Sequence, residues 1–282
     1  TQWLSLASKP FLTEGLSFDM PYDRFGVGII LMNNTAGAGN LNELNFHVSG
    51  AFRITDNNDM HHLHTGIQLG LIHKSVNLDN LVFDDQYSSA LGDFDPTLSN
   101  NEVFDKNKET LFDMNFGIYY YTRERFDVFK GKSAVSNILP VYAGFSTFHL
   151  TQPKEKYIGS DNYQYRRWVG YAGTMMQLHD HFAIEPNALY MYQAKNHDIN
   201  LGLLLHYDLK QGTDHYYINV GGQYRHKDAA VVSLGFNYEE FGFGLSYDIN
   251  FSGLKTATRG RGGFEISLTY THQKDFIASF FR

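Results

Sequence analysis

Cysteine is absent from this chain of 282 residues, and other familiar signals are missing with it. Without cysteine the chain has no disulfide scaffold and no metal site built on thiolates. No stretch of about 18 apolar residues occurs, so the sequence contains no candidate for a membrane-spanning helix. The longest uncharged apolar run, residues 26–32, is far too short for one.

Basic charge is also scarce, and it is scattered along the chain. Lysine and arginine total 23 against 30 aspartates and glutamates, which gives a formal net charge of -7. A clustered basic surface for nucleic acid is therefore missing, and nucleic acid is not an expected partner. Residues 1–10 also lack the basic start and apolar stretch of a signal peptide. We expect a chain that is either cytoplasmic or already processed.

Aromatic residues and glycine are plentiful, and the apolar residues recur with period two. Aromatic residues make up 16% of the chain, which also holds 26 glycines. In residues 241–251 large apolar side chains alternate with glycine, serine, aspartate and asparagine, and residues 43–53, 216–225 and 264–271 alternate similarly. This pattern predicts strands with one apolar and one polar face and excludes helices for these segments.

Thirteen segments carry this pattern, so the sequence predicts an all-β fold. A closed up-and-down barrel needs an even number of strands, and residues 2–7 are the candidate for a fourteenth. The predicted strands cover residues 11–20, 25–33, 42–54, 62–74, 110–122, 138–149, 164–178, 182–194, 199–209, 215–225, 229–238, 241–251 and 263–272.

The connections between these strands alternate in length. Short connections at 21–24, 55–61, 179–181, 210–214 and 239–240 share one end with a longer one at 123–137. Longer loops gather at the other end, where 34–41, 76–110, 150–163 and 252–262 join the shorter 194–198 and 226–228. Short turns at one rim and long loops at the other are typical of bacterial outer-membrane barrels.

Alternation alone does not distinguish a membrane barrel from a soluble β-sandwich, since both have one apolar face. The strand lengths favour the barrel, because many are near the 9 to 11 residues that cross a bilayer. Aromatic residues at strand ends favour it too. We therefore predict a single domain over residues 1–282, a transmembrane up-and-down antiparallel β-barrel of about 14 strands with a polar lumen, open or plugged, and a tail at 273–282. A soluble all-β domain is the alternative.

Polar residues on the inward face are the candidate site. Buried charges there must pair, so an internal ion-pair network is one interpretation, and contact with a partner's strand or a solute is the other. In the loop 252–262, three basic side chains meet either lipopolysaccharide phosphates or a protein partner, or else only solvent. The candidates are Glu43, Arg53, Glu185, Asn187, Asn219, Arg225, Asp248, Asn250 and Glu265 on the strands, and Lys255, Arg259 and Arg261 in the loop.

Other polar groups give weaker indications of chemistry. His62 and His64 share one strand face while His61 points away, so we expect histidines solvated at the rim and no metal site. Ser146 and His149 lie three apart in a predicted strand and so face opposite sides, which argues against a hydrolase. The acidic loop 76–110 matches no calcium-binding pattern. No catalytic residue, metal or cofactor is expected.

Several segments resemble the PorP/SprF family of the type IX secretion system of Bacteroidetes. They are residues 143–153 (AGFSTFHLTQP), 216–225 (YYINVGGQYR), 242–250 (GFGLSYDIN) and 262–270 (GGFEISLTY), together with Gln2-Trp3 near the start. The resemblance spans nearly the whole chain.

This resemblance implies a non-enzymatic protein of the bacterial outer membrane that serves secretion or surface attachment of large proteins. The implied partners are outer-membrane lipid, a SprA-type translocon, the C-terminal domain of a large secreted adhesin and a periplasmic lipoprotein ring, and gliding motility is the implied context. A diffusion channel or fatty-acid-type porin is the alternative function.

Overall fold

The computed structural model describes residues 11–37, 39–55, 60–77, 81, 83–89, 92–95, 97–99, 107–122, 140–156, 162–179, 181–209, 216–253 and 261–272. Strands account for nearly all of the regular structure, with a single 3-10 turn, η2 (Asp84–Gln86), in this part of the chain. Within the same residues, no helix is long and apolar enough to span a membrane.

Fourteen strands form one large sheet, and four short strands form two small hairpins. The large sheet consists of β1 (Leu12–Tyr22), β2 (Phe25–Ala36), β3 (Leu41–Arg53), β4 (His61–Ser75), β7 (Lys108–Thr122), β8 (Val141–Phe148), β11 (Arg167–Thr174), β12 (Met176–His179), β13 (Phe182–Gln193), β14 (Asn196–Asp208), β15 (Tyr216–Arg225), β16 (Ala229–Tyr238), β17 (Phe241–Asn250) and β18 (Arg261–Tyr270). The small hairpins are β5 (Tyr87–Ser88) with β6 (Asp93–Phe94), and β9 (Lys154–Glu155) with β10 (Asn162–Tyr163).

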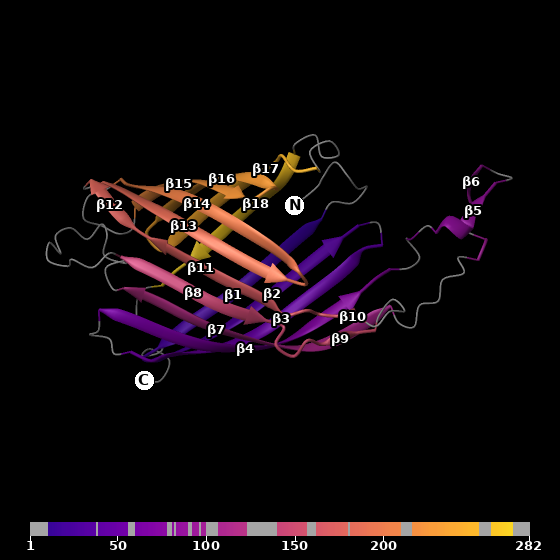
Figure 1. Cartoon of the computed structure of the whole chain (residues 1–282), viewed down its shortest axis with the longest axis horizontal. Coiled ribbons are helices and arrows are strands. Elements are labelled where there is room, and N and C mark those ends of the chain that lie inside the picture. Colours follow the sequence, from indigo (N-terminus) through magenta and orange to yellow (C-terminus); the bar gives the residue numbers. More distant parts are fainter. Residues whose placement is uncertain are drawn as a thin grey trace.

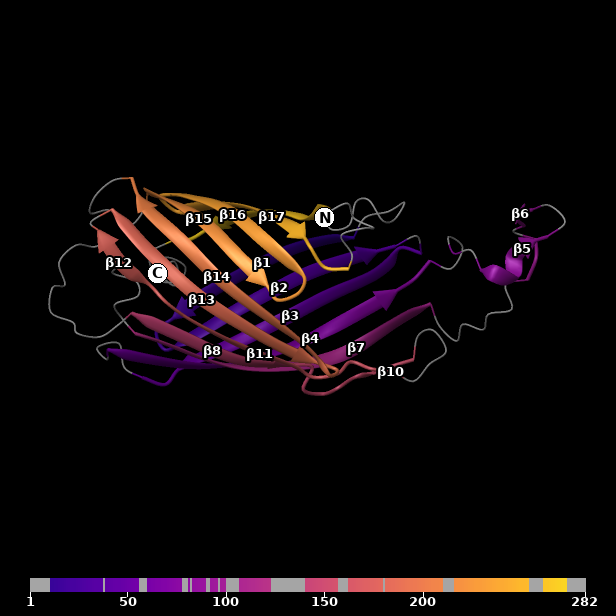
Figure 2. The same ribbon diagram turned by 45° about the horizontal axis from the view of Figure 1, so that its top comes forward.

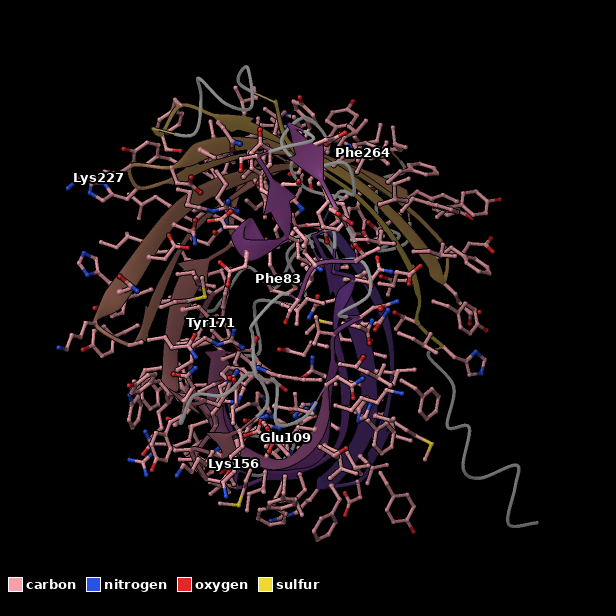
Figure 3. All side chains as sticks on the ribbon, turned by 90° about the vertical axis from the view of Figure 1, so that its right-hand side faces the viewer. Phe83, Glu109, Lys156, Tyr171, Lys227 and Phe264 are labelled. Atoms are coloured by element: carbon pink, nitrogen blue, oxygen red, sulfur yellow. The ribbon has the colours of Figure 1, made fainter. Side chains whose placement is uncertain are left out.

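Every strand of the large sheet pairs with its neighbour in sequence, and each pairing is antiparallel (Figures 1 and 2). The order runs from β1 to β18, with β5, β6, β9 and β10 outside it and β12 joined only to β13. Seen along the strands, the sheet curls around a central space (Figure 3). In the described residues, β1 and β18 are therefore the two ends of a strongly curled meander.

The two faces of the sheet differ in the way that the sequence pattern predicts. On β3, Phe46 and Val48 are 42% and 47% exposed, whereas Asn45 and His47 between and beside them are 6% and 8% exposed. Large apolar side chains thus cover the outer face, and the side chains around the central space are mostly polar. We call that second side the inner face.

Tight turns at one end of the sheet fix the register of the hairpins. Asp23 follows β1 with a φ of 49°, and Glu239 follows β16 with a φ of 51°. Two-residue turns with positive φ match the right-handed twist of the strands that they join, so they favour direct antiparallel pairing. The long connections 76–107 and 149–166 lie at the opposite end, which we call the long-loop end.

The predicted strand count is too low for the chain as a whole. Eighteen strands are present in the described residues, against about 14 predicted, because the two small hairpins lie inside connections that the sequence pattern showed only as loops. The predicted strand 164–178 is two strands, β11 and β12, interrupted at Met175, whose N–H donates to the Pro140 carbonyl at 3.0 Å. Residues 2–7 and the tail 273–282 lie outside the described residues.

Candidate functional site

Polar side chains of β3, β4 and β7 meet a turn-rich segment on the inner face near the long-loop end. We call residues 149–156, which directly follow β8, the strap. Lys74 of β4 reaches Glu155 of the strap at 2.6 Å and Glu43 of β3 at 3.2 Å. The side chains of these three residues are 12%, 16% and 30% exposed, so the charges compensate one another largely away from water.

Beside this charge cluster, Asp113 of β7 is fully buried and binds two histidines through one carboxylate oxygen. His149 Nδ1 lies 3.1 Å and His47 Nε2 3.4 Å from Asp113 Oδ2. His149 also donates its backbone N–H to Asn115 Oδ1 at 2.9 Å. The strap is therefore attached to the inner face of β3, β4 and β7, which we call the wall, by a continuous group of polar side chains rather than by one contact.

A second polar group lies on β8, β13, β14, β15 and β16, nearer the short-turn end. The Tyr142 hydroxyl donates to Glu185 Oε1 at 2.7 Å, and His206 Nε2 lies 2.9 Å from Glu185 Oε2. The other ring nitrogen of His206 is 2.7 Å from Asn219 Oδ1, and the Asn219 amide donates to Asn237 at 3.4 Å. Buried polar groups in this row find partners on neighbouring strands or, for Tyr142 and Glu185, across the intervening β11, as buried polar groups must.

Glycines make room for these side chains on neighbouring strands. A Cβ at Gly70 would clash with the His47 ring and with the Phe46 carbonyl oxygen. A Cβ at Gly173 would clash with the Tyr142 hydroxyl. Small residues on the inner face thus allow the polar rings to lie flat against the sheet.

The wall formed by β14 to β18 has smaller side chains and borders a cavity. Arg225 Nη1 lies 3.2 Å from Asp228 and 3.3 Å from Asp248, which is the main ion-pair group there. A cavity of about 1160 Å³ is lined by this wall and by β1 and β2. The residues of β15 to β18 that line it include Gly221, Gly222, Gln223, Ser233, Ser246, Gly263, Glu265 and Ser267.

The predicted site residues do not converge on one place. Glu43 belongs to the cluster at Lys74, Glu185 to the row at His206, and Arg225 pairs with Asp248, so the structure gives three separate groups. Asn250 is 6% exposed. The predicted inward charges on these strands are thus largely used in internal pairing.

The remaining candidates have weaker contacts or lie outside the described residues. Among the described residues, Arg53 forms an ion pair with the exposed Asp23, at 3.9 Å. Lys255 and Arg259 are outside the described residues, and of Arg261 only the backbone, at the start of β18, is described. Alternation alone could not identify the strap residues Glu155 and His149, which lie beyond the end of a strand.

The histidines near residue 60 are placed as predicted in one respect and not in another. His62 stacks on Tyr121 at 4.8 Å and His61 on Tyr120 at 6.0 Å, so the two rings lie on opposite faces. His62 is only 6% exposed, however, so the expectation that these histidines are all solvated is wrong. Tyr121 covers the ring. Among the described residues, no group of three or more histidines and carboxylates is arranged to hold a metal ion.

The prediction that Ser146 and His149 face opposite sides of one strand also fails in part. It places both in one strand, but β8 ends at Phe148 and His149 has a φ of 58°. The chain therefore turns at His149, and its ring faces Asp113 on the inner side. Strand parity does not apply across that turn.

The connection 76–107 carries a small structured motif that projects well away from the sheet (Figures 1 and 2). η2 leads into the β5–β6 hairpin, and the Gln86 side chain closes the motif by donating to the Leu98 carbonyl at 3.1 Å. Hydrogen bonds from the Thr97 hydroxyl and backbone N–H hold the pKa of the exposed Asp95 carboxyl below its usual range.

Comparison with protein families now adds to this geometry. The model of the family "Type IX secretion system membrane protein PorP/SprF" matches residues 1–270. The chain belongs to the PorP/SprF family. Membership confirms the resemblance found in the sequence, and it confirms that the protein is located in the bacterial outer membrane.

Solved structures share the architecture only distantly. The toluene transporter TbuX of Ralstonia pickettii is 9% identical, with 92% of this chain and 81% of that chain covered and a TM-score of 0.49. A FadL homologue of Pseudomonas aeruginosa is 12% identical, with 91% and 74% covered and a TM-score of 0.45. Likenesses this low do not bear on function. The search of curated proteins gave no match.

Proposed function

We propose that this PorP/SprF protein is a non-enzymatic component of the type IX secretion system that binds or anchors a cognate secreted surface protein. The family match over residues 1–270 carries this proposal. The curled sheet with an apolar outer face and a polar inner face supports it, since such a sheet suits lipid outside and water inside.

The proposal includes a closed barrel of about fourteen strands. Leaving β12 out of the 14-stranded sheet gives 13 strands in successive antiparallel pairs, so β1 and β18 run in the same direction. One further strand, antiparallel to both, would complete the antiparallel order. Hydrocarbon offers no hydrogen-bond partners, and each unsatisfied backbone group there costs several kcal/mol, which favours closure.

The absence of catalysis is also part of the proposal. The buried carboxylates Asp113 and Glu185 each contact two ring or hydroxyl groups of the inner face, which suits a structural role. The proposed partners are a SprA-type translocon, the C-terminal domain of a secreted adhesin and a periplasmic lipoprotein ring. The adhesin would meet the long-loop end, including Lys255, Arg259 and Arg261.

A test of this function uses the protein in its own membrane. Affinity purification after mild detergent extraction is expected to recover a translocon subunit and one large surface protein with it. Recovery of the protein alone, from cells that secrete the surface protein normally, would contradict the proposal.

The cavity favours a second candidate function, a diffusion channel, because about 1160 Å³ of space lies along the wall of β14 to β18. Conductance in planar bilayers separates the two candidates. Stable open channels from the pure protein support diffusion, whereas a closed bilayer together with a co-purified surface protein supports anchoring.

A further inference from the structure

One edge of β7 lacks a neighbouring strand of the large sheet over half of its length. β7 has 15 residues and pairs with β4 along all of them, from Lys108 to Thr122. Its pairing with β8 covers only Phe116 to Tyr121. Residues 108–115 therefore have a sheet neighbour on one side only, among the described residues.

The strap lies along this edge. Its Leu150 N–H donates to the Met114 carbonyl at 2.8 Å, and the Thr151 hydroxyl donates to the Phe112 carbonyl at 3.2 Å. The strap does not continue β8 in the large sheet, because His149 and Gln152 have φ values of 58° and 45°, and its residues 154–155 form β9, which pairs with β10 instead. It covers the edge without forming a regular ladder.

Contacts that involve a side chain hold the strap more than backbone–backbone hydrogen bonds do. Among the described residues, one backbone–backbone hydrogen bond joins the strap to β7. The strap's contacts through His149 and Thr151 are joined by the Lys74–Glu155 ion pair and by the Lys156 N–H, which donates to Glu109 Oε2 at 2.7 Å. Figure 3 shows Glu109 and Lys156 close together at the wall. A segment held in this way detaches when a few side-chain contacts break, whereas a strand within a sheet must lose a whole row of backbone hydrogen bonds.

The covered edge lies where an external partner would arrive. β4 and β7 have 15 residues each, more than the 9 to 11 that cross the hydrocarbon. Residues 108–115 are at the long-loop end of β7, and with the excess of about four to six residues at this end the first of them would project beyond the hydrocarbon. An uncovered edge at that position is a template for an added strand, the usual mode of strand addition to a sheet.

We propose that the strap is a displaceable cover, and that an extended strand of the secreted partner takes its place along residues 108–115 of β7. This inference rests on the proposed function, since it gives the partner its docking edge. Glu155 with Lys74 acts as the lock, because this pair is the shortest ion pair between the strap and the wall.

The test uses the full chain in detergent micelles or liposomes, with a synthetic peptide of residues 148–156 that carries a photo-reactive group as the probe. Glu155→Gln removes the charge at the lock while keeping its shape. We expect this variant to capture about tenfold more peptide than the wild type. A tenfold change corresponds to weakening the attachment of the strap by about 1.4 kcal/mol. Asp248→Asn, which breaks an ion pair of the opposite wall, is the matched control and should leave capture unchanged.

A covalent lock keeps the test decisive. Because the chain has no cysteine, Met114→Cys with Leu150→Cys provides the only thiols, at two residues joined by a backbone hydrogen bond. Oxidation is expected to abolish peptide capture and reduction to restore it. Equal capture by the oxidised and reduced protein would overturn the inference, as would equal capture by Glu155→Gln and the wild type.

These outcomes are separable from those of the proposed function. If no surface protein co-purifies from the native membrane, the proposed function fails. Peptide capture that depends on the lock would still show a displaceable cover. If the surface protein co-purifies equally well with the oxidised cysteine pair, the function stands and the docking edge is wrong.

Discussion

Two walls of the sheet have similar apolar outer faces and different inner faces. The first wall is formed by β3, β4, β7 and β8, and the second by β14 to β18. On the first wall, inner positions carry large polar side chains such as His47, Asp113 and Lys74, which interlock across three strands and the strap. On the second, inner positions of β17 include Ser246, which lines the large cavity, and Gly242 and Gly244, which line a smaller one of about 330 Å³. The difference shows that lipid dictates only one face of each strand, and the other is free to be packed or hollow.

The two walls also differ in what a substitution would meet. At the first wall a new atom meets a ring or a backbone carbonyl, as at Gly70. At the second, a Cβ at the inner Gly235 would first meet the movable Asn219 side chain, at 3.3 Å. The first wall is tightly packed near the long-loop end, and the second wall borders a cavity. This combination suits a protein that anchors a partner on a rigid wall while part of its interior stays open. Three pairs of substitutions test this contrast.

The largest effect is expected where the outer face meets lipid. Leu245→Arg places a guanidinium against hydrocarbon and should lower the free energy of unfolding by about 2 to 4 kcal/mol near the bilayer midplane. Ser246→Arg points toward the cavity and should cost less, because the arginine finds water there. Urea titrations in liposomes measure both. Equal losses would mean that the assignment of the two faces is wrong.

A smaller effect is expected from a glycine pair on the inner face. Gly70→Ala forces a Cβ against the Phe46 carbonyl and the His47 ring and should cost about 1 to 3 kcal/mol, as overpacking does. Gly235→Ala, whose Cβ would first meet the movable Asn219 side chain at 3.3 Å, is the control on the second wall and should cost less. A Gly235→Ala loss as large as that of Gly70→Ala would contradict the looser packing of the second wall.

The last pair compares a buried carboxylate on β13, which pairs with the first strand of the second wall, with an exposed carboxylate on β18 of that wall. Glu185→Ala leaves Tyr142 and His206 without their buried partner and should cost about 1 to 3 kcal/mol. Glu265→Ala removes an exposed carboxylate that borders the cavity and should change stability by less than about 0.5 kcal/mol. The same urea titrations in liposomes measure both losses. A larger loss for Glu265→Ala than for Glu185→Ala would refute a structural role for the group of Glu185, Tyr142 and His206.

Much of the sheet could be predicted from alternation, because each strand's apolar residues mark one face whatever its neighbours are. The strand 229–238 has the predicted bounds, and β17 differs by one residue at its end. The break at Met175 was missed because its hydrogen bond to the Pro140 carbonyl joins residues far apart in sequence. The two small hairpins were missed because strands of two residues are too short to show alternation. For the candidate site, alternation placed Glu185 and Asp248 inward and gave no sign of the strap.

The sequence by itself determined the all-β class, the two-faced strands and the family, since these depend on residue order within each short segment. The tertiary structure alone decided which polar residues pair. Glu43 and Glu155 are 112 residues apart in sequence, and both reach Lys74 only because β3 and β4 are neighbours and the strap folds back onto them. Ion pairs form through space, and the curl of the sheet brings their partners together.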